Sequence, residues 1–292
     1  MNSGKDSFAI VSPVRNEAEF LPKTIEAIVS QTIRPHIWVI VDDGSTDDTL
    51  AIAQKAASQY SFIKAISRPD RGFRLAGRGV IEAFYDGYNQ LKDEPWDFLV
   101  KMDADVTFDP TYFEECFERF KSDPKLGIGG GTVCSLKSNV LQPESDDPAF
   151  HVRGATKIYR RECWDGIGGL IRAPGWDTLD EVKANMLGWT TLTFPEIRLQ
   201  HFRPAGDAYG AWSNWTKNGM ANYVLAYHPL FMFLKCCKRL FVKPYVLSAI
   251  GLLFGYFKGY VTKAPRVDDR ELIRYFRRQQ MNLLLGKKSL WK

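Results

Sequence analysis

The chain has 292 residues, of which 45% are hydrophobic and 25% are charged, and its formal net charge is +5. This balance is typical of a globular protein with one large domain, or with one domain and an appendage, and it excludes a disordered or fibrous chain. The mild positive charge suits an anionic ligand or a membrane surface, and we expect no nucleic-acid partner. Five cysteines without a CxxC pair favour free thiols in a reducing compartment over disulfides or a zinc site.

The first part of the chain alternates short apolar runs with segments of helical periodicity. We expect strands at 7–14, 36–41, 62–66 and 97–102, and helices at 17–31, 47–59 and 80–91. This alternation predicts an α/β fold with a parallel sheet, in which ligands bind beyond the carboxyl ends of the strands. The acidic pairs Asp42–Asp43 and Asp103–Asp105 each follow a strand, so we expect them to share one crevice.

The later segments have weaker patterns. We expect a Gly-rich strand at 127–135, a loop at 139–150, a strand or helix start at 154–160 and an extended segment at 190–199. Thr178 and Glu181 fit a capping box, which predicts a helix over 179–187 that stops at Gly188. After about residue 220 the chain becomes helical, aromatic and basic, so we divide it into residues 1–219 and 220–292.

The Asp103-Ala104-Asp105 motif suits a metal site. Two carboxylates at a strand end can share a divalent cation, Mg²⁺ or Mn²⁺, with a diphosphate, since these ions prefer oxygen ligands. The cation would neutralise charge on a leaving diphosphate. A solvated acidic loop is the alternative, and the motif alone does not separate the two.

Three motifs together resemble those of the family 2 glycosyltransferases, over about residues 7–205. They are Val11-Ser12-Pro13-Val14-Arg15-Asn16-Glu17, Asp42-Asp43-Gly44-Ser45-Thr46-Asp47 and Asp103-Ala104-Asp105. The resemblance implies the GT-A fold, a mostly parallel sheet with helices on both faces, here followed by a helical extension. It also implies inverting, metal-dependent transfer of a sugar from a nucleotide-diphosphate donor, for which UDP is the commonest nucleotide in the family.

The resemblance also implies site residues. It assigns the nucleotide to Pro13, Val14, Arg15, Glu17, Asp42, Asp43 and Asp103, and the metal to Asp103 and Asp105. The basic loop RPDRGFRLAGR adds Arg71, Arg74 and Arg78 as candidate diphosphate contacts, since guanidinium groups suit phosphate. His201 is a candidate third metal ligand and Arg203 a candidate phosphate contact. A solvated arginine and an ordinary polar histidine are the alternatives.

The general base is less clearly marked. The family has a Glu-Asp pair that opens a helix, whereas this chain has Trp176-Asp177 and Asp180-Glu181. When the base is located by counting back from Gly188, which ends the expected helix, the position falls on Asp177. When it is located by counting forward from Gly168-Gly169, the position falls on Asp180. We prefer Asp180 as the base, because it would lie in the first turn of the expected helix. The acid that is not the base would then interact favourably with the helix dipole near the N-terminus of the helix.

The end of the chain bears on the acceptor. Gln200-His201-Phe202-Arg203 is followed by Pro204, where processive family members have Trp, which favours transfer of a single sugar. Residues 223–262 mix aromatic residues with Lys and Arg and could form an amphipathic hairpin on an anionic membrane, or helices packed on the domain. The apolar segment 244–257 is shorter than the roughly 20 residues that span a bilayer.

We therefore expect a cytoplasmic enzyme, peripheral at the inner face of the plasma membrane. The N-terminal residues MNSGKDSFAIVSP contain no signal-type apolar stretch, in keeping with this location. The acceptor would be a glycan or a lipid-linked molecule in cell-envelope or polysaccharide biosynthesis. One alternative is a nucleotidyltransferase, which would need a Gly-rich, Lys-containing loop where this chain has SPVRNEAEF. The other is an inactive protein that binds sugar nucleotides.

Overall fold

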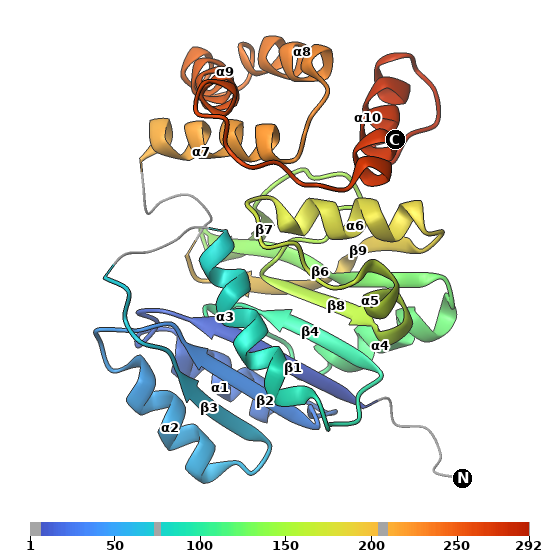
Figure 1. Cartoon of the computed structure of the whole chain (residues 1–292). Helices are drawn as coiled ribbons and strands as arrows, with labels where there is room; N and C mark the ends of the chain where they lie inside the picture. Colours follow the sequence, from blue (N-terminus) through green and yellow to red (C-terminus); the bar gives the residue numbers. More distant parts are fainter. Residues whose placement is uncertain (1–6, 73–76, 204–209, 292) are drawn as a thin grey trace.

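A computed structural model of the chain describes residues 7–72, 77–203 and 210–291 (Figure 1). One sheet of nine strands has the order β3-β2-β1-β4-β8-β6-β9-β5, and β7 pairs with β6. The strands are β1 Phe8–Val14, β2 Ile37–Asp42, β3 Ile63–Ser67, β4 Phe98–Met102, β5 Val106–Phe108, β6 Leu126–Lys137, β7 Val140–Pro143, β8 Thr156–Arg160 and β9 Thr190–His201. The helices are α1 Leu21–Val29, α2 Thr49–Gln59, α3 Arg78–Tyr88, α4 Tyr112–Ser122, α5 Arg161–Ile167, α6 Trp176–Met186, α7 Ala211–Val224, α8 Pro229–Arg239, α9 Val246–Val261 and α10 Arg270–Leu284, with a 3-10 turn over Asn89–Leu91.

The two halves of the sheet differ. Strands β3, β2, β1 and β4 are mutually parallel, as the alternating pattern predicts. Beyond β4 the chain runs back and forth along the sheet, so β8 is antiparallel to both β4 and β6, β5 is antiparallel to β9, and only β9 is parallel to β6. The sheet is therefore mixed, with its parallel half as expected.

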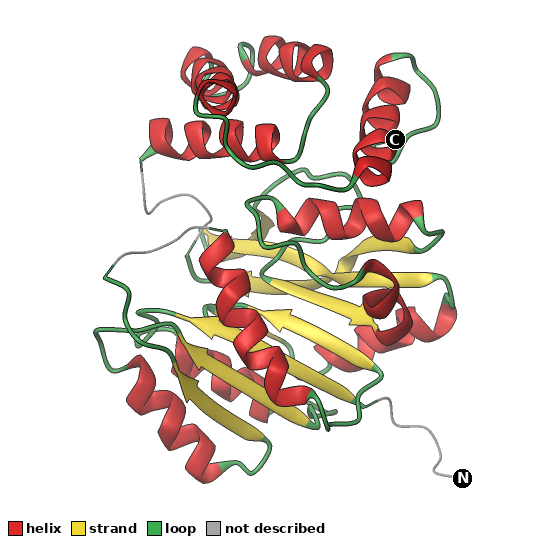
Figure 2. Cartoon of the chain, in the orientation of Figure 1, coloured by secondary structure: helices red, strands yellow, loops and turns green. Residues whose placement is uncertain are grey.

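Helices cover both faces of the sheet (Figure 2). Successive residues of a strand point to opposite faces, and strand β1 sends Phe8 and Ile10 to one core and Ala9 and Val11 to the other. Helices α1, α2 and α4 complete the first core, and α3, α5 and α6 complete the second. Because both faces are buried, the central strands are apolar throughout.

Two local expectations need correction. Helix α6 begins at Trp176 rather than at residue 179. Its N-cap is Gly175 at φ 82°, which offers no side-chain capping hydrogen bond, so the predicted Thr178–Glu181 capping box is wrong. Residues 139–150, expected to be a loop, contain β7, which forms a hairpin with β6. All five cysteines are free thiols, as expected.

Helices α7 to α10 form a further layer that packs on the outer side of α6 (Figure 1). Leu179 and Val182 of α6 join a third core with residues such as Tyr223, Leu252 and Phe276. The helical extension is thus confirmed, although helix α7 runs through the predicted boundary at residues 219 and 220. No helix in the described part of the chain is long and apolar enough to cross a membrane.

Helices α7 and α9 pack so closely that their backbones are in contact. A Cβ atom at Gly219 would lie 2.1 Å from the carbonyl oxygen of Leu252, and one at Gly255 would lie 2.0 Å from that of Thr216. Gly259 meets the ring of Tyr223 in the same way. The opposite side of α9 carries large apolar side chains that are exposed: Val246, Ile250, Phe254, Phe257 and Val261.

Candidate active site

The turn between β4 and β5 carries Asp103 and Asp105. Thr24 of α1 is fully buried beneath this turn, and its hydroxyl lies 2.7 Å from the carbonyl oxygen of Ala104 and 2.8 Å from that of Val106. The backbone N–H of Asp103 donates to the carbonyl of Ala155. The turn is therefore fixed on both sides, at the carboxyl end of a central strand.

The pairing of β5 with β9 brings His201 to the same place. His201 lies opposite Val106 in the register, one residue from Asp105. One ligand atom each from Asp103, Asp105 and His201 lie within 4.8 Å of one another, and Nε2 of His201 is 3.4 Å from Oδ1 of Asp105. Two carboxylates and an imidazole fit a divalent cation with a preference for oxygen and nitrogen ligands.

Arg203 joins the N-terminal motif to this turn. Its guanidinium binds the Glu17 carboxylate, and its Nε lies 3.3 Å from Oδ2 of Asp105. Glu17 is nearly buried, its N–H donates to the hydroxyl of Thr49 over 2.7 Å, and its Oε2 has no hydrogen-bond partner among the residues that the structure describes. Burial, together with the charge of Asp105, raises the pKa of Glu17 to about 7. We call Asp103, Asp105, His201, Glu17 and Arg203 the open charge cluster.

Neighbouring carboxylates also shift the pKa of His201. Burial lowers the pKa of His201, but hydrogen bonds to Asp105 and Glu144 outweigh it, and the pKa is raised to about 9. Burial raises the pKa of Glu144, and hydrogen bonds from His201, Ser135 and Arg153 lower it to about 2. His201 therefore lies between two carboxylates.

The end of β2 brings the second acidic pair to the neighbouring loop. Asp43 forms ion pairs with Arg68, at 2.5 Å, and with Arg71, while Nη1 of Arg15 donates to its carbonyl oxygen. Asp42 is buried and accepts weakly from the N–H of Ser45 at 3.3 Å. These contacts place Asp43 at the centre of three arginines.

The remaining predicted nucleotide residues differ in their placement. Val14 packs its side chain into the core, so only its backbone is available to a ligand, whereas Pro13 beside it is partly exposed. Arg78 pairs with Glu82 at 2.7 Å and is 63% exposed. Arg74 lies outside the described residues.

The two candidate bases have different surroundings. The Asp180 side chain has no exposed surface, and it accepts hydrogen bonds from Nζ of Lys157 at 2.9 Å and from the hydroxyl of Tyr159 at 2.6 Å. Asp177 is partly exposed in the first turn of α6, and no hydrogen bond or ion pair to its carboxylate occurs within the described residues. Only its backbone carbonyl is engaged, by Lys157.

Asp180 belongs to what we call the closed charge cluster, formed by Lys157, Asp180, Glu181 and His151. Lys157 lies 2.7 Å from Oε1 of Glu181, and Nδ1 of His151 lies 2.9 Å from Oε2 of Glu181. Burial lowers the pKa of His151, but Glu181 outweighs it and raises the pKa to about 9. The carboxylates of Asp180 and Glu181 also raise the pKa of Lys157 against the effect of burial.

Two buried lysines connect the clusters. Lys101 and Lys157 lie directly opposite each other on β4 and β8, and both lie over the Trp176 ring, at 5.4 and 5.5 Å. Lys101 binds the Asp103 carboxylate and donates to the carbonyl of Gly154 over 2.6 Å. A Cβ at Gly154 would lie 3.9 Å from the Cβ of Asp177, so the start of α6 lies beside this bridge.

Sequence reasoning missed Lys101, Lys157, Arg68 and Glu144. The available signal was a lysine in the middle of an apolar strand, in FLVKM and TKIYR, because a lysine is rarely buried without a partner. Arg68 and Glu144 carry no such signal, since each lies in a polar loop sequence.

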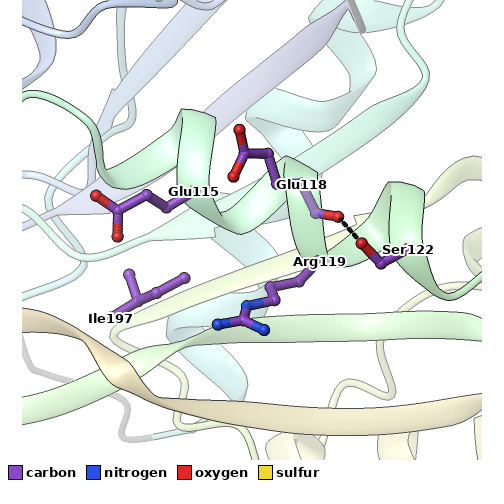
Figure 3. A pocket seen from close by; sticks show the side chains of 5 residues that line it. All are labelled: Glu115, Glu118, Arg119, Ser122 and Ile197. Carbon is purple, nitrogen blue, oxygen red and sulfur yellow. Dashed lines mark hydrogen bonds between the residues drawn. The ribbon is translucent and has the colours of Figure 1, made fainter.

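A hollow of about 290 Å³ lies elsewhere, on α4 (Figure 3). Glu115, Glu118, Arg119 and Ser122 of that helix line it together with Ile197 of β9. Arg119 pairs with Glu196, and Ser122 donates to the carbonyl of Glu118 within the same helix. None of the lining residues belongs to the open charge cluster, so this hollow is not the candidate site.

Comparisons with known protein sequences give one consistent family. The family model described as Glycosyl transferase family 2 matches residues 9–174. A cholesterol galactosyltransferase of Borreliella burgdorferi is 32% identical over 109 residues, which are 37% of this chain and 27% of that protein. A poly-beta-1,6-N-acetyl-D-glucosamine synthase of Staphylococcus aureus is 28% identical over 128 residues, 43% of this chain and 28% of that protein. The match thus spans about a quarter of each relative.

Solved structures resemble almost the whole chain. A mannosyltransferase from Pyrobaculum calidifontis in complex with GDP-Man and Mn²⁺ has a TM-score of 0.56 at 17% identity, covering 97% of this chain and 86% of that one. GalNAc-T7 with UDP, GalNAc and Mn²⁺ has a TM-score of 0.62 at 12% identity, covering 98% of this chain and 58% of that one. At such identities the likeness shows the fold.

Proposed function

Because the chain belongs to glycosyl transferase family 2 and has the GT-A fold, we propose that it is an inverting enzyme that transfers one sugar from a nucleotide-diphosphate donor to an acceptor hydroxyl. The observation that carries the proposal is the meeting of Asp103, Asp105 and His201 at the carboxyl end of the parallel half of the sheet. The relatives include a poly-beta-1,6-N-acetyl-D-glucosamine synthase, which supports our placing the product in cell-envelope or polysaccharide biosynthesis.

We assign the donor to the loops that follow β1 and β2. Asp42, Asp43, Arg15, Glu17 and the backbone at Pro13 and Val14 would hold the nucleoside. Arg71 and Arg203 would turn to the diphosphate, because guanidinium groups pair well with phosphate oxygens. The neighbours hold GDP-Man or UDP, which supports a nucleotide-sugar donor, and UDP stays our first choice.

Asp103, Asp105 and His201 would hold a divalent cation, which would neutralise charge on the leaving diphosphate. Of Mg²⁺ and Mn²⁺ we prefer Mn²⁺, because an imidazole ligand suits the softer ion better. Mn²⁺ in both solved neighbours supports this choice. Positioning of the sugar and removal of the proton from the acceptor hydroxyl would be left to side chains of the chain itself.

We propose Asp177 as the general base in place of Asp180. Asp180 is bound to Lys157 and Tyr159 and has no exposed surface, whereas the Asp177 carboxylate is reachable at the start of α6. The acceptor hydroxyl would give its proton to Asp177 as its oxygen bonds to the anomeric carbon. The bond from that carbon to the diphosphate would break on the opposite side, and the electron pair would leave with the diphosphate.

We further propose that the acceptor is presented at a membrane surface. Residues 211–267 contain eight of the chain's 39 lysines and arginines and none of its 34 aspartates and glutamates. The outer sides of α8 and α9 and the turn between them expose apolar side chains, among which Phe241 of the turn and Val261 of α9 are each 82% exposed. Exposed lysines such as Lys238 and Lys258 lie beside them. An apolar face edged by positive charge suits an anionic bilayer, and an acceptor carried by a lipid would be held there.

A donor screen tests the reaction. Release of nucleotide diphosphate is measured for UDP- and GDP-sugars with Mn²⁺, with Mg²⁺ or with chelator, in the presence of a membrane lipid extract. We expect release from one donor with metal, and a loss of about 10³-fold or more in Asp105→Ala. Release of inorganic pyrophosphate from a nucleoside triphosphate and a sugar phosphate would instead identify a nucleotidyltransferase. Donor binding without turnover, whatever the acceptor, would indicate a binding protein.

Vesicle co-sedimentation tests the membrane surface. We expect the chain to bind vesicles of phosphatidylcholine with phosphatidylglycerol, and to bind phosphatidylcholine alone more weakly. Phe254→Ser with Phe257→Ser should lower binding at least about tenfold, because two apolar side chains leave the bilayer. Leu187→Ser with Leu192→Ser, at exposed positions on the catalytic domain, is the matched control. Equal binding of both double variants would count against this surface, and a dimer lost in the first one would assign the face to self-association.

A further inference from the structure

Glu144 lies behind the imidazole of His201, on the side away from Asp105. Its Oε1 is 3.0 Å from Nδ1 of His201, while Nε2 of the same ring is 3.4 Å from Oδ1 of Asp105. Glu144 directly follows β7, the strand that folds back on β6. The order carboxylate, imidazole, carboxylate therefore runs from the hairpin to the turn between β4 and β5.

The carboxylate of Glu144 is itself fixed. The hydroxyl of Ser135 donates to Oε1 over 2.8 Å, and Nη1 of Arg153 donates to Oε2 over 2.6 Å. Its backbone N–H donates to the carbonyl of Val133 over 3.1 Å. The Glu144 side chain is 7% exposed, so each of its two oxygens has a protein partner in place of water.

A carboxylate in this position determines which nitrogen of a histidine is free. In the neutral imidazole that a cation requires, the Nδ1–H of His201 would donate to Glu144 and leave the lone pair of Nε2 directed toward Asp103 and Asp105. Histidines that bind metals commonly donate their second nitrogen to a carboxylate in this way, which fixes the ring and makes it a stronger ligand. A neutral or absent side chain at position 144 would leave the ring free to turn.

We propose that Glu144 is a positioning residue of the metal site, which holds His201 in the tautomer and orientation that present Nε2 to a divalent cation. This inference rests on the proposed function only in that the site takes such a cation. Glu144 acts through His201 and touches neither donor nor acceptor.

The rival role of Glu144 is to fasten the β6–β7 hairpin through Arg153. The two roles separate by experiment, because Arg153→Gln removes the partner of Oε2 and leaves the contact with His201 in place. Loss of a structural contact lowers the melting temperature, whereas loss of the positioning contact lowers the affinity for metal.

The experiment measures Mn²⁺ binding to the full chain without donor, by electron paramagnetic resonance of free Mn²⁺. We expect Glu144→Gln to weaken binding about 10- to 100-fold, and Arg153→Gln to change it less than about threefold. Pulsed resonance should detect the imidazole nitrogen coupled to bound Mn²⁺ in the wild type, and this signal should fade in Glu144→Gln. Thermal unfolding of each variant confirms that it is folded.

A double-mutant cycle makes the test decisive. If Glu144 acts through His201, then Glu144→Gln has no further effect on Mn²⁺ affinity in a His201→Ala background. An undiminished effect in that background, or an unchanged affinity and nitrogen signal in Glu144→Gln alone, would overturn the inference while leaving the metal site intact. Absence of Mn²⁺ binding in the wild type, both without nucleotide and with added UDP, would instead overturn the metal-dependent proposed function.

Discussion

The closed and open charge clusters use the same residue types to different ends. In the closed cluster Lys157, Asp180 and Glu181 have no exposed side-chain surface, and each carboxylate is bound by cations and hydrogen-bond donors of the chain. In the open cluster Asp103 is 35% exposed, Arg203 is 42% exposed, and one Glu17 oxygen has no partner in the described part of the chain. Charges that satisfy one another hold the fold together, and charges that remain reachable and incompletely satisfied are available to a ligand.

Substitution of the two candidate bases should give the largest effect that tests the difference between the closed and open charge clusters, and this effect is on the rate of the reaction. We expect Asp177→Asn to lower kcat about 10²- to 10⁴-fold with the donor that the screen selects, because it removes the proposed general base without removing a contact of the fold. Asp180→Asn should keep most of the activity per folded molecule and lower the stability instead. The opposite pattern would return the catalytic role to Asp180 and break the comparison.

A second test breaks the closed cluster itself. We expect Lys157→Met to lower the free energy of unfolding by about 3 to 5 kcal/mol, because Asp180 and Glu181 are left buried without a cation. Urea denaturation followed by circular dichroism measures this loss. Lys92→Met, at an exposed position, is the matched control and should change the stability little. A similar small change in both variants would show that the buried charges contribute no more than surface ones.

The smallest effect is in the pH dependence of stability. His151 has a pKa of about 9 in the folded chain, against 6.5 as its ordinary value. Its contribution of about 1 to 3 kcal/mol is therefore present in full below about pH 6.5 and is lost as the pH rises through about 9. Urea midpoints of the wild type and His151→Gln should converge over that range. A constant difference between pH 6 and pH 9.5 would mean that the Glu181–His151 pair carries no net charge stabilisation.

Much of the parallel half of the sheet was predictable, since its strands are apolar runs separated by helical periodicity. The acidic pairs at the ends of β2 and β4 followed from the same pattern. The mixed half was not predictable, because β5 has three residues and β7 has four, too few to show alternation. That His201 meets Asp105 depends on the register of β5 with β9, which no local pattern records.

The start of α6 shows a different limit of sequence reasoning. Gly175 precedes the helix as its N-cap in a left-handed conformation, so the usual signal of Ser, Thr or Asp at the N-cap is absent. Asp177 and Asp180 are both acids near the start of a helix, and their sequence context is alike. What separates them is that Lys157 of a distant strand reaches the Asp180 carboxylate, which only the folded chain shows.

The contact between α7 and α9 leaves helix α9 with one side that cannot vary and one that can. Gly251, Gly255 and Gly259 admit no side chain, because a Cβ atom would collide with α7. Val246 and Ile250 are exposed, so their replacement leaves that packing unchanged. If the exposed side of α9 binds a membrane as proposed, the exchange of a few side chains on this one helix would direct the same sheet to a different surface. The residues proposed to bind the donor would stay unchanged.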